Sequence, residues 1–513
     1  MAPESSQPEI STVDEYCLHI AGYVVIPGVL TPQEVAACNE AIDRVGRREG
    51  MLDWETPWCD PFVRLHEHPV LTGYLDQLCY QKSRLDRPPR LLDDQVAPSA
   101  PLAGGGEPRN WSGSYYHGNE SRFILGVHAI WALEDIDEGD GGFSLVPCSH
   151  KSLVETPADI LDGSDDMDLT LQPVLKAGDL LLSVATLLQG MRPWTGKAKR
   201  LLSSGYISGL VRRSNGAPSE DHDGDLPDWV EEMTPEQRVI LGVDRPNPAP
   251  VVHSDGVKTW VDEAPGTYHP STMIRDPDCQ IDEKEFYFWD LNGYLVLRDV
   301  MDKAWLVAAN EAIDDAADRI VKGGDSTHDT KRLAGTALSS LSGLFDLPHP
   351  HGEPFRRMIA NPALVQRLNW ISGSGFVVDA ARAIIYEKGT SGHGVHSGCF
   401  PGTARSIYAL QNGRTYCETI NVAWQLRDVN AGDGGFFGIP GSHKTSLPLP
   451  DDVRSLEDER GLIKHVAMKA GDVVLFMGSA QIHGAYPWTN DTPRRAVIVN
   501  YVSRNLDKPP RRF

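Results

Sequence analysis

Short runs of β-branched and aromatic residues, separated by Gly, Pro and Asp, recur through the last third of the chain. Runs of this kind are typical of short β-strands bounded by turns. Many short strands behind a helical cover favour a double-sheet β-roll of the jelly-roll kind. We therefore predict a mainly β fold with covering helices, an α+β arrangement. The strands that the pattern predicts are 383–386, 419–426, 436–439, 465–468, 472–477 and 495–502.

A strand and an amphipathic helix are predicted near the start of the chain and again in its second half. The apolar run 23–26 leads into a helix that begins with Thr31, Pro32 and Glu34. These residues fit a capping box with proline at the first helical position. The apolar run 294–297 is followed by a second segment with apolar residues at helical spacing.

The two halves of the chain are copies of one unit. WALEDIDEGDGGFSLVPCSHK (131–151) matches WQLRDVNAGDGGFFGIPGSHK (424–444), and KAGDLLL (176–182) matches KAGDVVL (469–475). Two earlier blocks match in the same order, so the similarity indicates a duplication.

The duplication divides the chain into two tandem domains joined by a linker. We predict that both are double-stranded β-helix domains, of the jelly-roll or cupin-like kind. The segment between the copies is rich in Pro, Gly, Asp and Ser, which is typical of a linker, and it contains one short helical pattern. The boundaries predicted are 1–211 for the N-terminal copy, 212–281 for the linker and 282–513 for the C-terminal copy.

Charge and composition exclude several classes of function. The chain has 71 acidic and 48 basic residues and a formal charge of −23, which disfavours binding to nucleic acid. No apolar run is long enough to span a membrane, and the N-terminus has no signal-peptide pattern. The eight cysteines form no CxxC pair. We therefore expect a cytoplasmic protein with no membrane partner.

Two histidines of the C-terminal copy are missing together from the N-terminal copy. His396 lies in the sequence GHGVHSG, expected to be a loop, and His483 follows an apolar strand. Alignment of the copies places Ala103 and Gln189 opposite them. Two ligands of one metal would be lost as a pair, whereas independent core histidines would not. His393 is the rival of His396.

Other polar residues in the repeated blocks need separate interpretation. His443 has a counterpart, His150, in the N-terminal copy, so a structural role is favoured for it. Arg494 opens the last strand, and a guanidinium group suits bidentate binding of a carboxylate. Arg200 is the approximate counterpart of Arg494 in the N-terminal copy. Arg495 competes with Arg494 by one residue of register.

The order of these motifs resembles that of the phytanoyl-CoA dioxygenase family. The family consists of iron(II)- and 2-oxoglutarate-dependent oxygenases with a double-stranded β-helix fold. The resemblance spans nearly all of residues 286–505, with a degenerate version over about 15–210. It implies that His396 and His483 bind iron(II), that Arg494 binds the distal carboxylate of 2-oxoglutarate, and that O2 is consumed.

The sequence departs from the family pattern at one ligand. The family's first motif, His-x-Asp or His-x-Glu, supplies a carboxylate, but Gly398 stands at that position. A carboxylate from elsewhere, with Glu418 the best placed, is one explanation. Two histidines with water are a second. The third is a chloride at the vacant position, as in the related iron/2-oxoglutarate halogenases.

The function expected is oxidation of an unactivated C–H bond of a small molecule, most simply by hydroxylation. Asn421 and Trp424, on the strand 419–426, are candidates for contact with the co-substrate, although Trp131 is the counterpart of Trp424 and favours a core role. The alternatives are a halogenase, a metal enzyme that does not use oxygen, and a non-catalytic binding protein with an arginine-held carboxylate ligand. The N-terminal copy is expected to contact and support the C-terminal copy.

Overall fold

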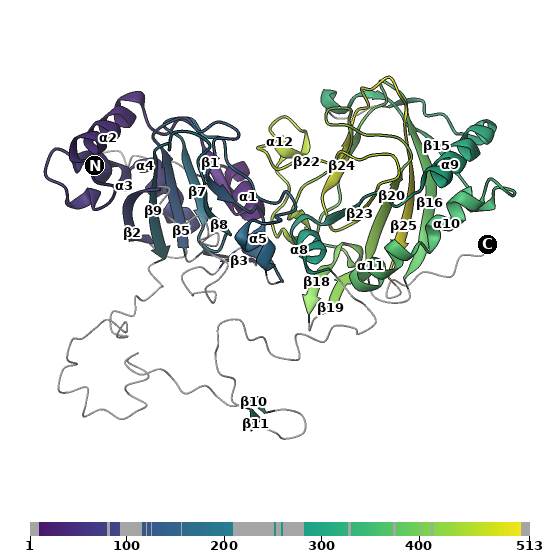
Figure 1. Cartoon of the computed structure of the whole chain (residues 1–513), viewed down its shortest axis with the longest axis horizontal. Helices are drawn as coiled ribbons and strands as arrows, with labels where there is room; N and C mark the ends of the chain where they lie inside the picture. Colours follow the sequence, from purple (N-terminus) through teal and green to yellow (C-terminus); the bar gives the residue numbers. More distant parts are fainter. Residues whose placement is uncertain are drawn as a thin grey trace, which may run out of the picture.

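The structure is a computed structural model of the 513-residue chain, in which two sheet-rich bodies lie side by side (Figure 1). Helices α1, α5, α8 and α12 lie between them (Figure 1). The residues that the structure describes are 10–79, 83–92, 115–118, 121–124, 126–154, 156–208, 251–252, 258–259, 282–326, 330–372, 376–400, 402–411 and 414–503. The helix predicted in the linker and Ala103 lie outside them.

The N-terminal copy consists of helices packed against an antiparallel sheet. The sheet has the order β1-β7-β5-β9-β2, and β6 pairs with β8 in a second layer. Thr31 caps α2 and forms the predicted capping box with Glu34. The elements are α1 (Thr12–Ala21), β1 (Tyr23–Ile26), α2 (Pro32–Val45), α3 (Asp60–His66), α4 (Pro69–Leu78), β2 (Ser83–Leu92), β3 (Tyr115–Gly118), β4 (Ser121–Ile124), β5 (Gly126–Ala132), β6 (Gly142–Leu145), α5 (Ala158–Asp162), β7 (Leu180–Val184), β8 (Gln189–Arg192) and β9 (Leu201–Ser208).

The C-terminal copy repeats this plan with larger sheets. One sheet has the order β12-β23-β20-β25-β16-β15, and a second has the order β17-β24-β21-β22. The elements are α8 (Glu283–Asn292), β12 (Tyr294–Leu297), α9 (Lys303–Asp315), β13 (Asp325–Ser326), β14 (Gly335–Thr336), β15 (Ser339–Ser342), α10 (Glu353–Ile359), α11 (Pro362–Ser372), β16 (Val377–Tyr386), β17 (His393–His396), β18 (Tyr408–Gln411), β19 (Arg414–Cys417), β20 (Thr419–Gln425), β21 (Gly435–Gly438), α12 (Asp451–Arg454), β22 (Lys464–His465), β23 (Val473–Met477), β24 (His483–Tyr486) and β25 (Arg494–Val502). Between the copies, β10 (Val251–Val252) pairs with β11 (Lys258–Thr259).

The larger sheet of the C-terminal copy buries both of its faces. One face carries Val422 and Trp424 of β20 and packs with α9 in a helical core. The opposite face carries Ala423 and Phe476 and packs against Phe436 of the second sheet. Because side chains alternate along a strand, residues next to each other on β20 belong to different cores. The site described below lies on the face of Ala423.

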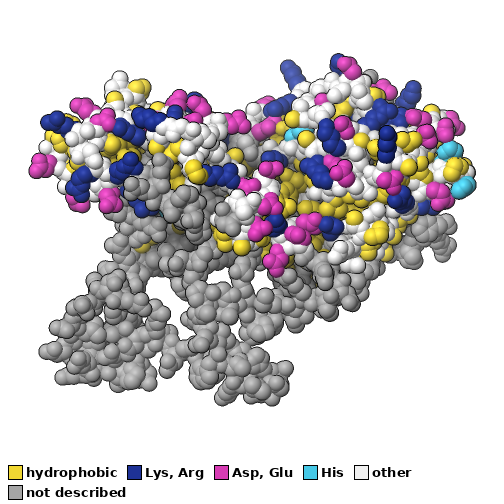
Figure 2. Space-filling view, viewed as in Figure 1, with side chains coloured by type: hydrophobic (Ala, Val, Ile, Leu, Met, Phe, Trp, Pro, Cys, Tyr) yellow, Lys and Arg dark blue, Asp and Glu magenta, His cyan; other side chains and the backbone are white. Residues whose placement is uncertain are grey.

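The distribution of charged side chains on the surface agrees with the excess of acidic over basic residues in the sequence, which disfavours nucleic-acid binding. Acidic and basic side chains are interspersed over the described residues on the face shown in Figure 2, which carries no continuous basic stripe. No helix in the described part of the chain is long and apolar enough to cross a membrane.

Candidate metal centre

His396 and His483 lie opposite each other on two paired strands. His396 is the last residue of β17 and His483 the first of β24, and the two are direct partners in the antiparallel ladder. Their ring centroids are 4.2 Å apart. The sequence predicted a loop at His396, but residues 393–396 form a strand because β24 provides a partner for their backbone. The structure thus brings the two histidines together.

Both histidine rings are oriented by backbone carbonyl groups. The Nδ1 atom of His396 lies 2.7 Å from the Gly394 carbonyl oxygen, and that of His483 lies 2.9 Å from the Gln481 oxygen. A carbonyl only accepts, so each Nδ1 carries the proton and each Nε2 keeps its lone pair. Burial lowers the pKa of His396, and burial together with the neighbouring His396 lowers that of His483 to about 3. Both imidazoles are therefore neutral, as metal ligands must be.

His393 lies beside this pair. Its ring centroid is 4.4 Å from that of His396, but its side chain is exposed and its backbone pairs with Ala485. Among the described residues, no three His, Cys, Asp or Glu side chains form a group that could hold a metal ion. The donor set in this part of the chain is therefore the pair of imidazoles.

The two candidate third-ligand positions do not supply a carboxylate to the pair. Glu418 is not grouped with the histidines, and its Oε2 atom accepts a hydrogen bond from Ser503 at 2.6 Å. Gly398 has a φ of +116°, and a Cβ atom there would lie 2.9 Å from Cγ1 of Ile482. Both the backbone conformation and the neighbour therefore favour glycine.

Arg494 is a buried cation on the larger sheet, on the face of Ala423, which packs against the sheet that carries both histidines. It begins β25, its backbone pairs with that of Tyr386, and its guanidinium carbon lies 5.2 Å from the centroid of the Tyr386 ring. Only 3% of Arg494 is exposed, and burial lowers its pKa. Its Nε atom has no hydrogen-bond partner, and no carboxylate within the described residues pairs with it. A buried, unpaired guanidinium is costly unless a ligand supplies the anion.

The register of the two arginines is fixed by their contacts. Arg495 points to the helical side and pairs with Asp314 of α9, at 2.5 Å. In the N-terminal copy Arg200 makes the same contact with Asp43 of α2. Arg200 is thus the counterpart of Arg495, which corrects its assignment to Arg494. The counterpart of Arg494 is one residue earlier.

That counterpart is Lys199, which has a different role. Its Nζ atom donates to the Asp135 carbonyl at 3.2 Å and lies 3.8 Å from Asp140, with about a third of the side chain exposed. Within the described residues, the N-terminal copy therefore has a partly exposed lysine where the C-terminal copy has the buried arginine.

Asn421 faces the site and Trp424 does not. The backbone of Asn421 pairs with Phe476, whose ring centroid is 4.8 Å from that of His483. Trp424 is fully buried on the opposite face, with its ring centroid 5.2 Å from that of Trp305. The structure places Trp424 in the helical core, because neighbouring residues on a strand point to opposite faces.

The N-terminal copy fills the equivalent position with a chain of hydrogen bonds. Leu145 pairs with Gln189 as Gly438 pairs with His483, so Gln189 occupies the histidine position. Ser183 Oγ donates to Gln189 Oε1 at 2.7 Å, and the Gln189 amide lies 2.5 Å from His128 Nδ1. A polar network of this kind stands where the C-terminal copy has its imidazole.

Sequence reasoning missed two residues of the site. Tyr386 was assigned only to a strand, although its ring lies beside the Arg494 guanidinium. Ile482 was not singled out, although it occupies the space next to Gly398. The position of Tyr386 at the end of a predicted strand was the one available signal. Nothing in the sequence pairs Ile482 with Gly398.

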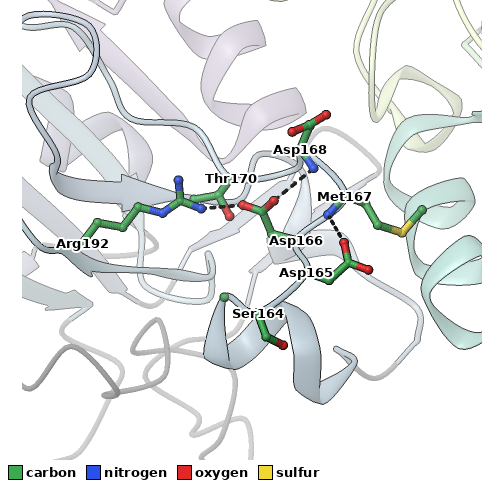
Figure 3. A pocket seen from close by; sticks show the side chains of 8 residues that line it. Ser164, Asp165, Asp166, Met167, Asp168, Thr170 and Arg192 are labelled. Atoms are coloured by element: carbon green, nitrogen blue, oxygen red, sulfur yellow. Dashed lines mark hydrogen bonds and ion pairs between the residues drawn. The ribbon is translucent and has the colours of Figure 1, made fainter.

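A separate hollow of about 420 Å³ opens in the N-terminal copy (Figure 3). It is lined by residues of the loop 163–170 and by Arg192. Asp166 pairs with Arg192 at 2.5 Å and accepts from the Asp168 amide at 3.1 Å, so its acidic group is already bonded (Figure 3). This hollow has no contact with the histidine pair.

Comparison with solved structures finds proteins that are similar to part of this chain. HygX from Streptomyces hygroscopicus, solved with nickel, 2-oxoglutarate and hygromycin B, is 17% identical, with a TM-score of 0.36 over 44% of this chain and 88% of HygX. The carbocyclase SnoK from nogalamycin biosynthesis is 18% identical, with a TM-score of 0.35 over 44% of this chain and 85% of SnoK. AviO1 from Streptomyces viridochromogenes Tue57 is 16% identical, with a TM-score of 0.32 over 43% of this chain and 95% of AviO1.

No curated protein matches the chain in sequence. The family profile described as phytanoyl-CoA dioxygenase (PhyH) matches residues 18–190 and again residues 289–496. The two matched regions coincide with the two copies and together cover well over half of the chain. The chain therefore belongs to the phytanoyl-CoA dioxygenase family, and carries that family's unit twice.

Proposed function

We propose that this protein is an iron(II)- and 2-oxoglutarate-dependent oxygenase with one active site, in the C-terminal copy. The observation that carries the proposal is the combination of two neutral, oriented imidazoles on the four-stranded sheet with a buried, unpaired arginine on the larger sheet that faces it. In the described part of the N-terminal copy, Lys199 and Gln189 stand at the positions of Arg494 and His483. The facing sheets of each copy are those of a double-stranded β-helix, and the domain boundaries remain 1–211, 212–281 and 282–513.

The residues present fit the group that the family uses. Iron(II) would be held by the Nε2 atoms of His396 and His483, whose Nδ1 protons are fixed by carbonyl oxygens. Arg494 would bind the distal carboxylate of 2-oxoglutarate, with the Tyr386 ring beneath it. When bound, iron(II) with 2-oxoglutarate and O2 supplies the oxidising power to functionalise a C–H bond.

The chain's own residues would position these groups and exclude water. Phe436 and Phe476 pack around His483, with ring centroids 6.2 and 4.8 Å from it. The desolvated surroundings strengthen the pairing of Arg494 with a carboxylate. Asn421, opposite Phe476, presents a polar side chain on the same face for the co-substrate or the substrate.

The substrate is proposed to be a small molecule, and the outcome to be hydroxylation of an unactivated C–H bond. Related structures bind small molecules: HygX was solved with hygromycin B, and SnoN with nogalamycin RO. The location of the protein is proposed to be cytoplasmic.

Gly398 favours a second candidate outcome, halogenation. Neither Gly398 nor Glu418 brings a carboxylate to the histidine pair, so a coordination position is left for water or for chloride. A non-catalytic protein that binds a carboxylate at Arg494 is the alternative of another class.

An anaerobic titration with iron(II) and 2-oxoglutarate, followed by the visible charge-transfer band, tests the proposal. We expect one iron per chain, lost in His483→Ala and retained in Gln189→Ala, its counterpart in the other copy. A change of the band on addition of chloride would favour halogenation over hydroxylation. Absence of a band in folded protein would refute the oxygenase and leave a binding protein.

A further inference from the structure

Two turns at the contact between the copies bind each other reciprocally. We call residues 149–153 the N-turn and residues 442–446 the C-turn. Lys444 Nζ donates to the Lys151 carbonyl at 3.0 Å, and Lys151 Nζ donates to the Lys444 carbonyl at 3.4 Å. The two lysines are matching residues of the repeated SHK motif. The contact therefore has an approximate twofold character.

The helices that cover the turns repeat the same reciprocity. The Leu153 amide of the N-turn donates to Asp290 of α8 at 3.0 Å, and the Ser446 amide of the C-turn donates to His19 of α1 at 3.1 Å. Asp290 and His19 are equivalent positions of the two copies. Each helix therefore holds the turn of the other copy.

This contact is buried and hydrogen-bonded. Asp290 is fully buried, pairs with Lys444 at 2.7 Å and accepts from Tyr408 at 2.8 Å. Apolar side chains from both copies, including Leu188 and Leu291, form one core cluster around it. Burial lowers the pKa of Lys151 to about 7. A desolvated, hydrogen-bonded contact of this kind allows little sliding, unlike a wet interface between domains.

The C-turn also holds the segment that carries His483. The Ile482 amide, directly before His483, donates to Ser442 Oγ at 2.8 Å. The Ile439 amide, three residues before Ser442, donates to the Ile482 carbonyl at 2.9 Å. The backbone leading into His483 is thus bonded on both sides to the C-turn and the strand before it.

The segment that follows His396 is also hydrogen-bonded to the C-turn. Cys399 Sγ donates to the Thr445 carbonyl at 2.9 Å, and the Gly398 amide donates to the Ser479 carbonyl at 3.0 Å. The loops of both candidate metal ligands are therefore anchored on one short turn, and that turn is held by the other copy.

We propose that the N-terminal copy positions the two metal-binding histidines by fixing the C-turn, with Ser442 and Lys151 as positioning residues. The inference rests on the proposed function for its role in catalysis. It explains why the chain keeps a second copy without a histidine pair. Metal affinity would depend on a contact whose Lys151 side comes from the other copy.

Four variants separate this role from simple stability. Ser442→Ala removes the acceptor of the Ile482 amide, and Lys151→Met removes the amine that crosses between the copies. Ser149→Ala is the matched control, because Ser149 Oγ accepts from the Leu188 amide, also at 2.8 Å, beside Gln189. Ser442→Thr retains a hydroxyl and should restore the wild-type behaviour.

Amide hydrogen exchange of the metal-free protein is the decisive readout. In Ser442→Ala and Lys151→Met we expect exchange at Gly398 and Ile482 to accelerate at least about tenfold, with Leu188 unchanged. In Ser149→Ala we expect only Leu188 to accelerate. Equal acceleration at all three amides, or none in Lys151→Met, would overturn the inference. Should Ser442→Ala fail to fold, the exchange rates in Lys151→Met and Ser149→Ala still test whether the N-terminal copy fixes the C-turn.

The visible charge-transfer band gives the functional readout. We expect Ser442→Ala and Lys151→Met to weaken iron(II) binding by at least about tenfold, and Ser149→Ala to leave it unchanged. Unchanged iron binding in the first two variants would overturn the positioning role while the oxygenase proposal stands. A wild-type protein without a band would refute the oxygenase, and the exchange experiment would still decide whether the N-terminal copy fixes the two segments.

Discussion

Ile482 occupies the space that a side chain at Gly398 would need: a Cβ atom at position 398 would lie 2.9 Å from Cγ1 of Ile482 and 3.3 Å from its Cδ1. The φ of +116° adds a backbone conformation that side chains rarely adopt. Ile482 directly precedes His483, so the same residue both fills this space and leads into a candidate ligand. Under the proposed function, the missing third ligand would therefore be built into the fold.

Gly398→Ala is expected to lower the free energy of unfolding by about 1–3 kcal/mol, through strain and the clash. Ile482→Ala should remove the clash, so the penalty of Gly398→Ala should be smaller in that background. Denaturant unfolding of the four proteins of this cycle measures the difference. Equal penalties in both backgrounds would show that backbone strain alone explains the glycine.

Arg494→Met is expected to separate binding from stability. Loss of the buried guanidinium should weaken 2-oxoglutarate binding at least about thirtyfold, or about 2 kcal/mol, and leave iron(II) binding intact. The ligand-free protein should become more stable by roughly 1 kcal/mol, because an unpaired buried cation is removed. Titration of the charge-transfer band and denaturant unfolding measure the two effects.

Arg495→Met is the matched control for that experiment. Arg495 pairs with the exposed Asp314 on the helical side, so its loss should change stability by less than about 1 kcal/mol and leave 2-oxoglutarate binding unchanged. If Arg495→Met abolished co-substrate binding and Arg494→Met did not, the roles assigned to the two arginines would have to be exchanged.

The residues of the site that could be predicted from the sequence are those that differ between its two copies. His396 and His483 stood out because their counterparts are absent, and the structure places them as ladder partners. The capping box at Thr31 was predicted because capping is local. The assignment of Arg200 to Arg494 was wrong by one residue, because the order of residues does not show that Arg495 reaches Asp314.

The remaining features depend on pairing between distant segments. Trp424 was named as a co-substrate candidate, although its counterpart Trp131 favoured the core, because both faces of β20 are buried and its alternation carries little signal. The strand 393–396 was predicted as a loop, because its partner lies far along the chain. The reciprocal contact of Lys151 and Lys444 has no sequence signature beyond the repeated SHK motif.

Acid is expected to destabilise the metal-free protein through buried histidines such as His443. Its Nε2 atom donates to the Asp290 carbonyl at 2.9 Å, and burial holds its pKa well below the ordinary value. The unfolded chain takes up the proton near pH 6.5, so this contribution is complete above that pH and is lost as pH falls below it. The loss should approach about 1.4 kcal/mol per pH unit for each such histidine.

Denaturant unfolding of metal-free protein at pH 7.5, 6.0 and 5.0 tests this, with His443→Gln as the comparison. The variant should be less stable at neutral pH, and its stability should fall less steeply with acid. A variant with the same acid dependence as wild type would show that other groups control the loss.

Gln189→His is expected not to create a second iron site. The substitution restores an imidazole at the position of His483 in the N-terminal copy. The alignment of the copies places Ala103 opposite His396, so the second imidazole of the pair would still be missing. The substitution also breaks the chain from Ser183 through Gln189 to His128, and removes the acceptor of the buried Ser183 hydroxyl. We therefore expect a loss of about 1–3 kcal/mol in stability and an iron content that stays at one per chain. Iron analysis after anaerobic loading and denaturant unfolding measure both, and a second equivalent of iron would show that the histidine alone had been missing.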